Sequence, residues 1–235
     1  MAAKTSSRVT KKKQAVATSK RIKKVASPRE AAYTAKRDVA STVGLIDWKN
    51  RCVEQSTQLR AEVRGIMTLC GGVNLWAGVP EYTSRIITPV MLQQAQNLVM
   101  TKHGCQLDKG GNPYVQHPLF VASLFRDRPS YQLVALMHDL LEDTDVTAQT
   151  LYMTFPPEVV DSVIALTCKS GESYDAYLQR ICDSSRTPRH VLYVKLADMY
   201  HNLDYTRLRK FTETEYRRFL KYRKALAQIK SALGG

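Results

Sequence analysis

The chain of 235 residues has the length of one substantial domain with extensions, or of two small domains at most. Hydrophobic residues make up 44% of it, enough to fill a core, and its formal net charge is +14. No stretch has the apolar length of a membrane span, and no compact apolar segment follows the first lysines. The sequence therefore predicts neither a transmembrane helix nor a secretory signal.

Most of the positive charge lies at the N-terminus. Residues 1–37 carry twelve Lys and Arg residues against the single acid Glu30. A segment of this composition, without an apolar period, cannot bury enough surface to offset its ordering entropy, so residues 1–40 are predicted to be a disordered basic arm. Such an arm could bind nucleic acid or another polyanion, act as a transit peptide, or remain a solvated tail without a partner.

The five cysteines are odd in number, widely spaced and without a C-x-x-C pair. This pattern is typical of reduced thiols, so we assign the cysteines to packing and expect a cytoplasmic location. The sequence gives no indication of the oligomeric state.

Residues 41–86 carry both tryptophans, Trp48 and Trp76, and an irregular amphipathic pattern. One or two helices are predicted here, followed by a connector with Gly and Pro from Gly71 to Pro80. We treat this segment as a helical extension of unknown role, and residues 87–235 as the main domain.

Local signals predict a series of helices from Thr88 onwards. Thr88 and Pro89 are typical of an N-cap and a first helical residue, and the helical spacing continues from residue 90 to 103. After "QLDKGGN", Pro113 is expected to open a second helix, and Ser130 to cap a third that ends at the acids of residues 139–145. Further starts are predicted at Thr147, Pro157, Ser173, Thr187-Pro188 (to about Leu208) and the capping box Thr212–Glu215 (through Leu233). No set of alternating strands is found, so the fold is predicted to be all-α.

The stretch "ALMHDLLEDTD", residues 135–145, places one histidine and four acids at the end of an apolar run. On a continuous helix Glu142 would lie one turn beyond His138, and Asp143 one turn beyond Asp139. Carboxylates this close repel one another, and a helix C-terminus adds partial negative charge, so a divalent metal would resolve the conflict. The alternative is a solvated helix end with the histidine packed beneath it.

Two further residues fit a metal site. His117 lies in "NPYVQHPLFVA", and Asp198 lies in the apolar helical stretch "VLYVKLADMYHNLD". A buried acid without a partner is costly, so Asp198 requires a cation. Two imidazoles and two carboxylates suit Mn²⁺ or Fe²⁺ and tolerate Zn²⁺. On the same helix face as Asp198, three side chains could hold an anionic substrate: Lys195, His201 and Asn202.

The ordered motifs "GNPYVQHP", "LMHDLLEDTDVT", "FPPEVVDSVIALT" and "VKLADMYHN" resemble those of the HD-domain hydrolases of the RelA/SpoT type. The resemblance covers about residues 88–230 and is to small stand-alone alarmone hydrolases such as the metazoan Mesh proteins. It implies an all-α HD-domain helical bundle that uses Mn²⁺, with Fe²⁺ or Zn²⁺ as alternatives. The implied reaction is hydrolysis of the 3′-pyrophosphate of guanosine tetra- and pentaphosphate, (p)ppGpp, with release of pyrophosphate.

The resemblance also implies a role for individual residues. The implied metal ligands are His117, His138, Asp139 and Asp198. Two carboxylates, Glu142 and Asp143, are implied to orient and deprotonate the attacking water. The implied substrate-binding residues are Lys109, Tyr114, Lys169, Lys195, Asn202 and Tyr222, of which Lys169 and Tyr222 match the family more loosely.

One position departs from the family pattern. Where the family has Arg-Lys, with the arginine stacking on the base, this chain has Asp108-Lys109. A carboxylate cannot offer a purine the cation-π stacking of a guanidinium. The base of the substrate is therefore open, and adenosine alarmones remain candidates. An HD-type phosphatase acting on NADPH or nucleoside monophosphates is the alternative enzyme, and a non-enzymatic binding module is the third hypothesis.

Overall fold

The computed structural model describes residues 49–68, 86–183, 187–208 and 212–234. The basic arm, both tryptophans and the connector from Gly71 to Pro80 lie outside the described residues. Within the described ranges every regular element is a helix, apart from an isolated bridge between Leu107 and Pro113, so the all-α prediction is confirmed. None of the helices in these ranges is both long enough and apolar enough to cross a bilayer.

The helices follow one another with short connections. In chain order they are residues 49–68, α2 (Pro89–Lys102), α3 (Gln116–Ser123), α4 (Pro129–Met137), α5 (Leu140–Asp143), α6 (Ala148–Tyr152), α7 (Pro157–Leu166), α8 (Tyr174–Cys182), α9 (Arg189–Asn202), the 3₁₀ helix η1 (Tyr205–Arg207) and α10 (Glu213–Ala232).

Side-chain caps begin several helices where the sequence predicts them. The Thr88 hydroxyl accepts the Met91 N–H at 3.3 Å, with Pro89 as the first residue of α2. Before α10, Thr212 and Glu215 form the predicted capping box, in which the Thr212 N–H donates to Glu215 Oε2 at 3.0 Å. Each cap satisfies an N–H group that the first helical turn leaves without a partner.

The prediction for the third helix is wrong in two respects. Ser130 lies inside α4, which begins at Pro129 with Arg128 as its N-cap, because the fixed φ of proline favours the first helical position. The helix also ends at Met137, before the acids, and α5 is a separate short helix. His138 and Asp139 therefore lie at the junction of two helices.

Two other helix boundaries also differ from the prediction. The helix α3 begins at Gln116, because Pro113 takes part in the bridge that closes the preceding loop. The helix α9 ends at Asn202, where the Leu203 N–H bonds to Met199 O at 2.9 Å, and the 3₁₀ helix η1 follows. Arg207 is therefore in this short turn and not in a continuation of α9.

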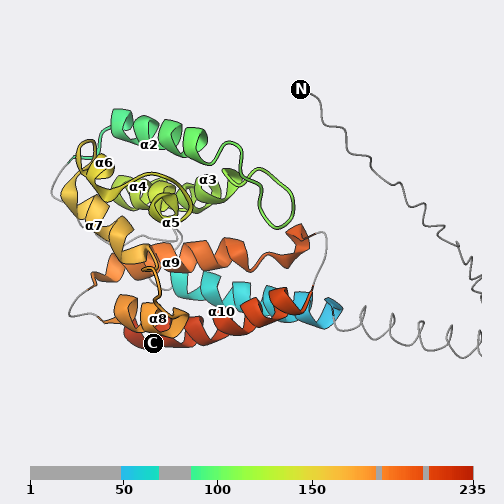
Figure 1. Cartoon of the computed structure of the whole chain (residues 1–235). Coiled ribbons are helices and arrows are strands. Elements are labelled where there is room, and N and C mark those ends of the chain that lie inside the picture. The colour runs from blue at the N-terminus through green and yellow to red at the C-terminus, as the bar shows by residue number, and fades with distance from the viewer. Residues whose placement is uncertain (1–48, 69–85, 184–186, 209–211, 235) are drawn as a thin grey trace, which may run out of the picture. The chain divides into compact units, whose positions relative to one another are not determined.

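The helix α9 lies in the middle of the fold, with α3 and α4 on one side and α8 and α10 on the other (Figure 1). Nine of its 14 residues are buried. The helix of residues 49–68 adds Leu59, Val63 and Met67 to the same core. Because α9 has core on both sides, its polar residues Asp198 and His201 are buried as well.

Candidate functional site

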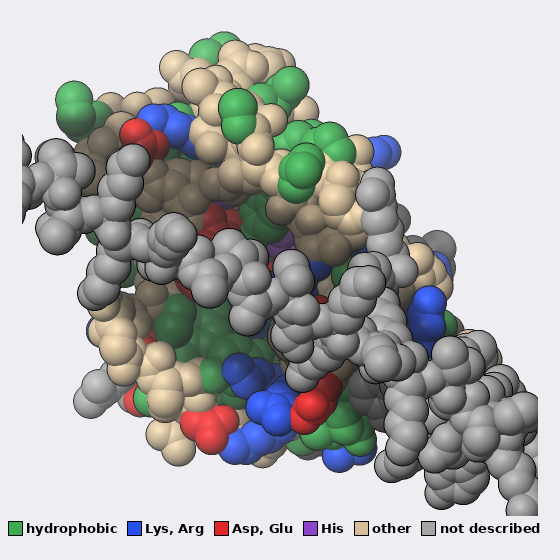
Figure 2. Space-filling model, turned by 45° about the vertical axis from the view of Figure 1, so that its right-hand side comes forward, with side chains coloured by type: hydrophobic (Ala, Val, Ile, Leu, Met, Phe, Trp, Pro, Cys, Tyr) green, Lys and Arg blue, Asp and Glu red, His purple; other side chains and the backbone are tan. Residues whose placement is uncertain are grey.

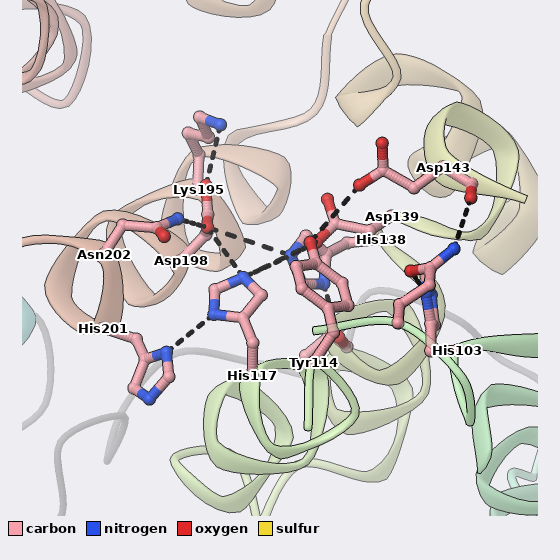
Figure 3. A network of polar contacts seen from close by, with 12 residues as sticks. His103, Tyr114, His117, His138, Asp139, Asp143, Lys195, Asp198, His201 and Asn202 are labelled. Atoms are coloured by element: carbon pink, nitrogen blue, oxygen red, sulfur yellow. Dashed lines mark hydrogen bonds and ion pairs between the residues drawn. The ribbon is translucent and has the colours of Figure 1, made fainter. Parts of the chain in front are cut away.

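Four side chains from three parts of the chain converge beside α9. His117 comes from α3, His138 and Asp139 from the junction of α4 and α5, and Asp198 from α9 (Figure 3). One ligand atom from each of the first three lies within 4.8 Å of the others. Asp139 Oδ2 is 3.0 Å from His138 Nε2 and 3.5 Å from His117 Nε2. Histidine and acidic side chains are visible in a recess of the surface in Figure 2.

Asp198 completes this cluster from the opposite side. Its Oδ1 lies 3.1 Å from His117 Nε2 and 3.9 Å from His138 Nε2. Its Oδ2 accepts from Lys195 Nζ at 2.8 Å, and the Asn202 amide donates to Oδ1. Burial raises the pKa of this carboxyl, but Lys195 and the two imidazoles outweigh burial and hold it well below its ordinary value. Asp198 is therefore a buried, ionised carboxylate.

The hydrogen bonds of His138 fix which of its ring nitrogens faces the cluster. Its Nδ1 lies 2.7 Å from Ala135 O, and a carbonyl oxygen can only accept, so Nδ1 carries the proton that it donates. The Nε2 atom is thereby left to face Asp139 and His117.

A similar argument applies to His117, through His201. Arg207 Nη1 lies 2.9 Å from His201 Nδ1, and because a guanidinium only donates, that nitrogen accepts. His117 Nδ1 lies 2.7 Å from the same His201 nitrogen and must therefore donate to it. Burial lowers the pKa of His201 to about 3, with contributions from His117 and Arg207, consistent with a neutral, accepting ring. His117 Nε2 is left free as a ligand atom.

The electrostatics of the cluster favour a cation. The Nε2 atoms of His117 and His138 lie 3.2 Å apart and face two carboxylates. Burial disfavours a charged His138 ring, but Asp139 and Asp198 outweigh burial and raise its pKa to about 9. The cluster therefore attracts positive charge, and its two imidazoles and two carboxylates form a donor set that a divalent metal accepts.

The two acids predicted to be catalytic occupy different surroundings. The Tyr114 hydroxyl lies 2.5 Å from Asp139 Oδ2 and 3.3 Å from Asp143 Oδ2, so it links Asp143 to the cluster. Burial and the neighbouring Asp139 raise the pKa of Asp143. Both acids are exposed, and Glu142 makes a different contact, in which its Oε2 accepts the Cys168 N–H at 3.1 Å.

A pocket opens beside the cluster between the loop of residues 107–114 and the segment after α9. It is lined by Leu107, Asp108, Lys109, Gly110, Tyr114, His117, Asn202, Asp204, Tyr205, Arg207, Leu208 and Arg218. His117 belongs both to this lining and to the cluster. Burial and the nearby charges of Arg218 and Lys221 lower the pKa of Lys109, which indicates crowded positive charge at the pocket.

The structure places the predicted substrate residues in different positions. Lys109, Tyr114 and Asn202 line the pocket, whereas Lys195 is bound to Asp198. Tyr222 is buried and accepts from Arg218 Nε at 3.0 Å, and Lys169 is exposed outside the lining.

Two arginines of the pocket, Arg207 and Arg218, were not predicted. Arg218 Nη2 donates to Asn202 Oδ1 at 3.1 Å, so the arginine is linked to a predicted substrate residue. Its position four residues before Tyr222 could have indicated a shared helix face. No local pattern marks Arg207.

Comparison with known proteins supports the resemblance in sequence. No protein-family model matches the chain. The "GTP pyrophosphokinase rsh" of Brucella ovis is 34% identical over 131 residues, which cover 50% of this chain and 17% of that protein. The "guanosine-3′,5′-bis(diphosphate) 3′-pyrophosphohydrolase" of Aquifex aeolicus is 35% identical over 122 residues, 48% of this chain and 17% of that protein. The Spiroplasma citri protein of the same name is 32% identical over 122 residues, 48% and 16% respectively. The chain thus spans only about a sixth of the length of these relatives.

A solved structure has a similar fold. It is that of a metazoan ortholog of SpoT that hydrolyses ppGpp and plays a role in starvation responses, and it aligns with a TM-score of 0.54 at 19% identity. The alignment covers 63% of this chain and 90% of the other. The resemblance to HD-domain hydrolases of the RelA/SpoT type is therefore confirmed, in sequence over about half of the chain and in fold over 63% of it.

Proposed function

We propose that this protein is a metal-dependent pyrophosphohydrolase that removes the 3′-pyrophosphate of guanosine or adenosine tetra- and pentaphosphate alarmones. The observation that carries this proposal is the position of His117, which belongs both to the His/Asp cluster and to a pocket lined by Lys109 and Arg218. The proposed metal site thus adjoins a cationic pocket, an arrangement that suits hydrolysis of a phosphorylated substrate.

Mn²⁺ is the proposed metal, with Fe²⁺ and Zn²⁺ as alternatives, because the donor set mixes imidazole nitrogen and carboxylate oxygen. The proposed ligands are His117 Nε2, His138 Nε2 and the carboxylates of Asp139 and Asp198. A divalent metal in this position supplies Lewis acidity, which activates water and withdraws charge from a phosphoryl oxygen.

Asp143 is proposed as the group that accepts the proton of the attacking water. Its raised pKa makes it a stronger base than an ordinary aspartate, and its contact with Tyr114 keeps it beside the cluster. Glu142 is proposed to help orient the attacking water. Its bond to the Cys168 N–H also holds residues 167–169 against α5.

The pocket is proposed to hold the remaining charge of the substrate. Lys109 and Arg218 offer N–H donors to phosphate oxygens, and Asn202 is held between Arg218 and Asp198. Together the ammonium of Lys109 and the guanidinium of Arg218 can bind a nucleotide that carries several phosphates.

Two further predictions belong to this proposal. A cytoplasmic location is supported by the free thiols of Cys52, Cys105, Cys168 and Cys182 among the described residues. The names of the similar proteins do not mention nucleic acid, so polyanion binding by residues 1–40 stays a prediction without support from them.

The test is product analysis with the purified full chain and Mn²⁺. ppGpp, ppApp, NADPH and a set of nucleoside monophosphates are supplied in parallel, and pyrophosphate and orthophosphate are measured separately. The proposal expects pyrophosphate from ppGpp or ppApp. Orthophosphate alone, from NADPH or a monophosphate, would show an HD-type phosphatase instead, and no product with any divalent metal would favour a binding module.

Matched variants connect the activity to the cluster. Asp139→Asn keeps the size of the side chain but removes a proposed ligand charge, and is expected to abolish turnover. Asp145→Asn is the control, because Asp145 lies in the same acidic stretch but pairs with Lys102 at 2.8 Å on the surface. Equal activity of the two variants would contradict the assignment of the metal site.

A further inference from the structure

Asp108 holds a guanidinium at the pocket. Its Oδ2 lies 2.5 Å from Arg207 Nη2, although the two residues are 99 positions apart in the sequence. Both residues belong to the pocket lining. The other carboxylate oxygen, Oδ1, accepts the N–H groups of Gly110 at 2.9 Å and Asn112 at 2.8 Å. Asp108 therefore fixes its own loop and the arginine at the same time.

The backbone brings these two segments into close contact. A Cβ atom added at Gly110 would lie 2.5 Å from Arg207 O, which is closer than carbon and oxygen atoms can approach. Only glycine allows this approach, so the loop of residues 107–113 rests directly against η1. The position of Arg207 is therefore set by main-chain packing as well as by its ion pair.

Both terminal nitrogens of the Arg207 guanidinium donate to protein groups, and one of these groups is a carboxylate. Nη2 donates to Asp108, and Nη1 donates to His201 Nδ1 at 2.9 Å. A guanidinium binds phosphate by its N–H edges and a flat ring by its face. The charge of Asp108 offsets that of the arginine, which weakens this guanidinium as an anion ligand.

Part of the Arg207 side chain is open to the pocket. The Arg207 side chain keeps 25% of its surface exposed, and among the described residues no aromatic ring covers it. The pocket lining adds Leu107 and Leu208, the neighbours in sequence of Asp108 and Arg207, which offer apolar surface. An apolar surface does not stabilise a bound phosphate group, whereas it can pack against the flat ring of a nucleobase.

We propose that Arg207 is the base-binding residue of this pocket, stacking its guanidinium face on the nucleobase, and that Asp108 and His201 are positioning residues that hold it there. The inference rests on the proposed function only in taking the ligand to be a nucleotide. A purine has more ring surface than a pyrimidine and gains more from this contact, so Arg207 confers a preference for purines.

The test is equilibrium binding to the full chain, which needs no turnover. The probes are GDP, CDP and inorganic pyrophosphate, titrated against wild type and Arg207→Ala at a Mn²⁺ concentration that saturates both proteins. Loss of a stacking contact is expected to raise the dissociation constant of GDP about 10-fold and that of CDP by less, so the purine preference shrinks. The dissociation constant of pyrophosphate, which has no base, is expected to change by less than about 2-fold.

Three more variants complete the test, and the first of them serves if Arg207→Ala folds poorly. Arg207→Lys retains a charge for Asp108 but has no planar face, so it is expected to weaken GDP binding and leave pyrophosphate binding unchanged. Arg217→Ala is the control, since Arg217 is exposed on α10 and pairs with Glu213 at 2.7 Å. The role of Asp108 is tested by Asp108→Asn, which is expected to weaken GDP binding in wild type but to have no further effect in Arg207→Ala.

The outcomes separate this inference from the proposed function. Equal weakening of GDP and pyrophosphate would show that Arg207 binds phosphate, and no change in either would show that it binds no ligand; both results overturn the inference. If wild type binds GDP with an Arg207-dependent purine preference but hydrolyses no alarmone, the inference stands and the proposed reaction fails. If the wild type hydrolyses ppGpp but binds purines no better than Arg207→Ala does, the proposed reaction stands and the inference fails.

Discussion

His117 Nδ1 donates to His201 Nδ1 across 2.7 Å, and this hydrogen bond leaves His117 Nε2 directed at the carboxylates of Asp139 and Asp198. Arg207 also donates to this nitrogen, at 2.9 Å, which shows that the nitrogen carries no proton and accepts. A histidine that binds a metal through one ring nitrogen commonly donates from the other, which fixes its tautomer and orientation. His201 thus orients His117, a proposed metal ligand, without facing the cluster itself.

Replacement of His201 by phenylalanine is therefore expected to weaken metal binding. The His201→Phe variant keeps a ring that can stack on Phe120, whose ring centroid lies 4.3 Å from that of His201, but it removes the acceptor. His117 then loses the partner that fixes its tautomer, and affinity for Mn²⁺ is expected to fall about 10- to 100-fold. Calorimetric titration of the metal-free protein with Mn²⁺ measures the change.

A buried histidine elsewhere on α9 provides the control for His201→Phe. His190 lies near the start of the helix and contacts Ser162 Oγ at 2.7 Å, away from the cluster. His190→Asn is expected to leave Mn²⁺ affinity unchanged. An unaltered affinity in His201→Phe would contradict the proposed role of the hydrogen bond.

The Tyr114 hydroxyl joins a proposed ligand to the proposed base, so its removal should lower activity. In Tyr114→Phe, Asp139 and Asp143 lose the donor that lies 2.5 and 3.3 Å from them. Two carboxylates without this donor repel each other in a partly buried site, and turnover is expected to fall about 10- to 100-fold. Steady-state rates with the best substrate at saturating Mn²⁺ measure the effect.

The matched control for Tyr114→Phe is Tyr152→Phe. The Tyr152 hydroxyl also lies 2.5 Å from an aspartate, Asp161, but this pair is exposed and contacts no residue of the cluster. Its removal is expected to leave the rate unchanged. A normal rate in Tyr114→Phe would mean that Asp143 needs no link to Asp139.

The sequence predicted those features of the fold that depend on neighbouring residues. The caps at Thr88 and Thr212 were predicted because an N-cap needs only a suitable side chain and the next helical turn. The junction at His138 was not predicted, since the apolar residues on both sides continue with helical spacing. Neither proline nor glycine lies between Leu136 and Leu140, so no local pattern marks the break.

The candidate site was predictable only in part, for the same reason. His117, His138 and Asp139 were expected to meet, and the structure brings their ligand atoms within 4.8 Å of one another. The role of Asp108 was not foreseen. In the sequence it is an acid where a stacking arginine was expected, whereas in the fold it holds Arg207. A contact across 99 positions cannot be predicted from the spacing of residues.

Loss of Lys195 is expected to lower the free energy of unfolding and to make that free energy depend more strongly on bound metal. Lys195 Nζ binds Asp198 Oδ2 at 2.8 Å, and the two side chains are only 16% and 7% exposed. In Lys195→Met the buried carboxylate loses this partner, which costs about 3 to 5 kcal/mol of unfolding free energy. Mn²⁺ is expected to restore more stability to the variant than to wild type, because it supplies the missing positive charge.

Urea denaturation with and without Mn²⁺ measures both effects of Lys195→Met. The control is Lys224→Met, which breaks the exposed pair of Lys224 and Asp175, 2.8 Å apart, and should cost at most about 1 kcal/mol with no dependence on metal. If the two variants are equally stable, Asp198 is neutralised by other groups in the protein.

The ion pair of Glu172 and Arg180 is expected to contribute stability that depends on pH. The guanidinium donates to Glu172 Oε1 and Oε2, each at 2.8 Å, and also to the main-chain oxygens of Ala165 and Thr167. Its hydrogen bonds to Glu172 outweigh the effect of burial, and the pKa of this carboxyl falls from 4.5 to about 2. A depressed carboxyl pKa stabilises the folded state fully above the unfolded-state value, and this contribution is lost as the pH falls from 4.5 to about 2.

The Glu172→Gln variant tests this pH dependence. Near neutral pH it is expected to be less stable than wild type by about 1 kcal/mol, after allowance for solvent screening. The difference should shrink as the pH is lowered through the range between 4.5 and about 2, because wild type then loses the charge that the variant already lacks. Urea denaturation of both proteins over this range measures it. A difference that stays constant with pH would show that Glu172 stabilises the loop after α7 by its hydrogen bonds and not by its charge.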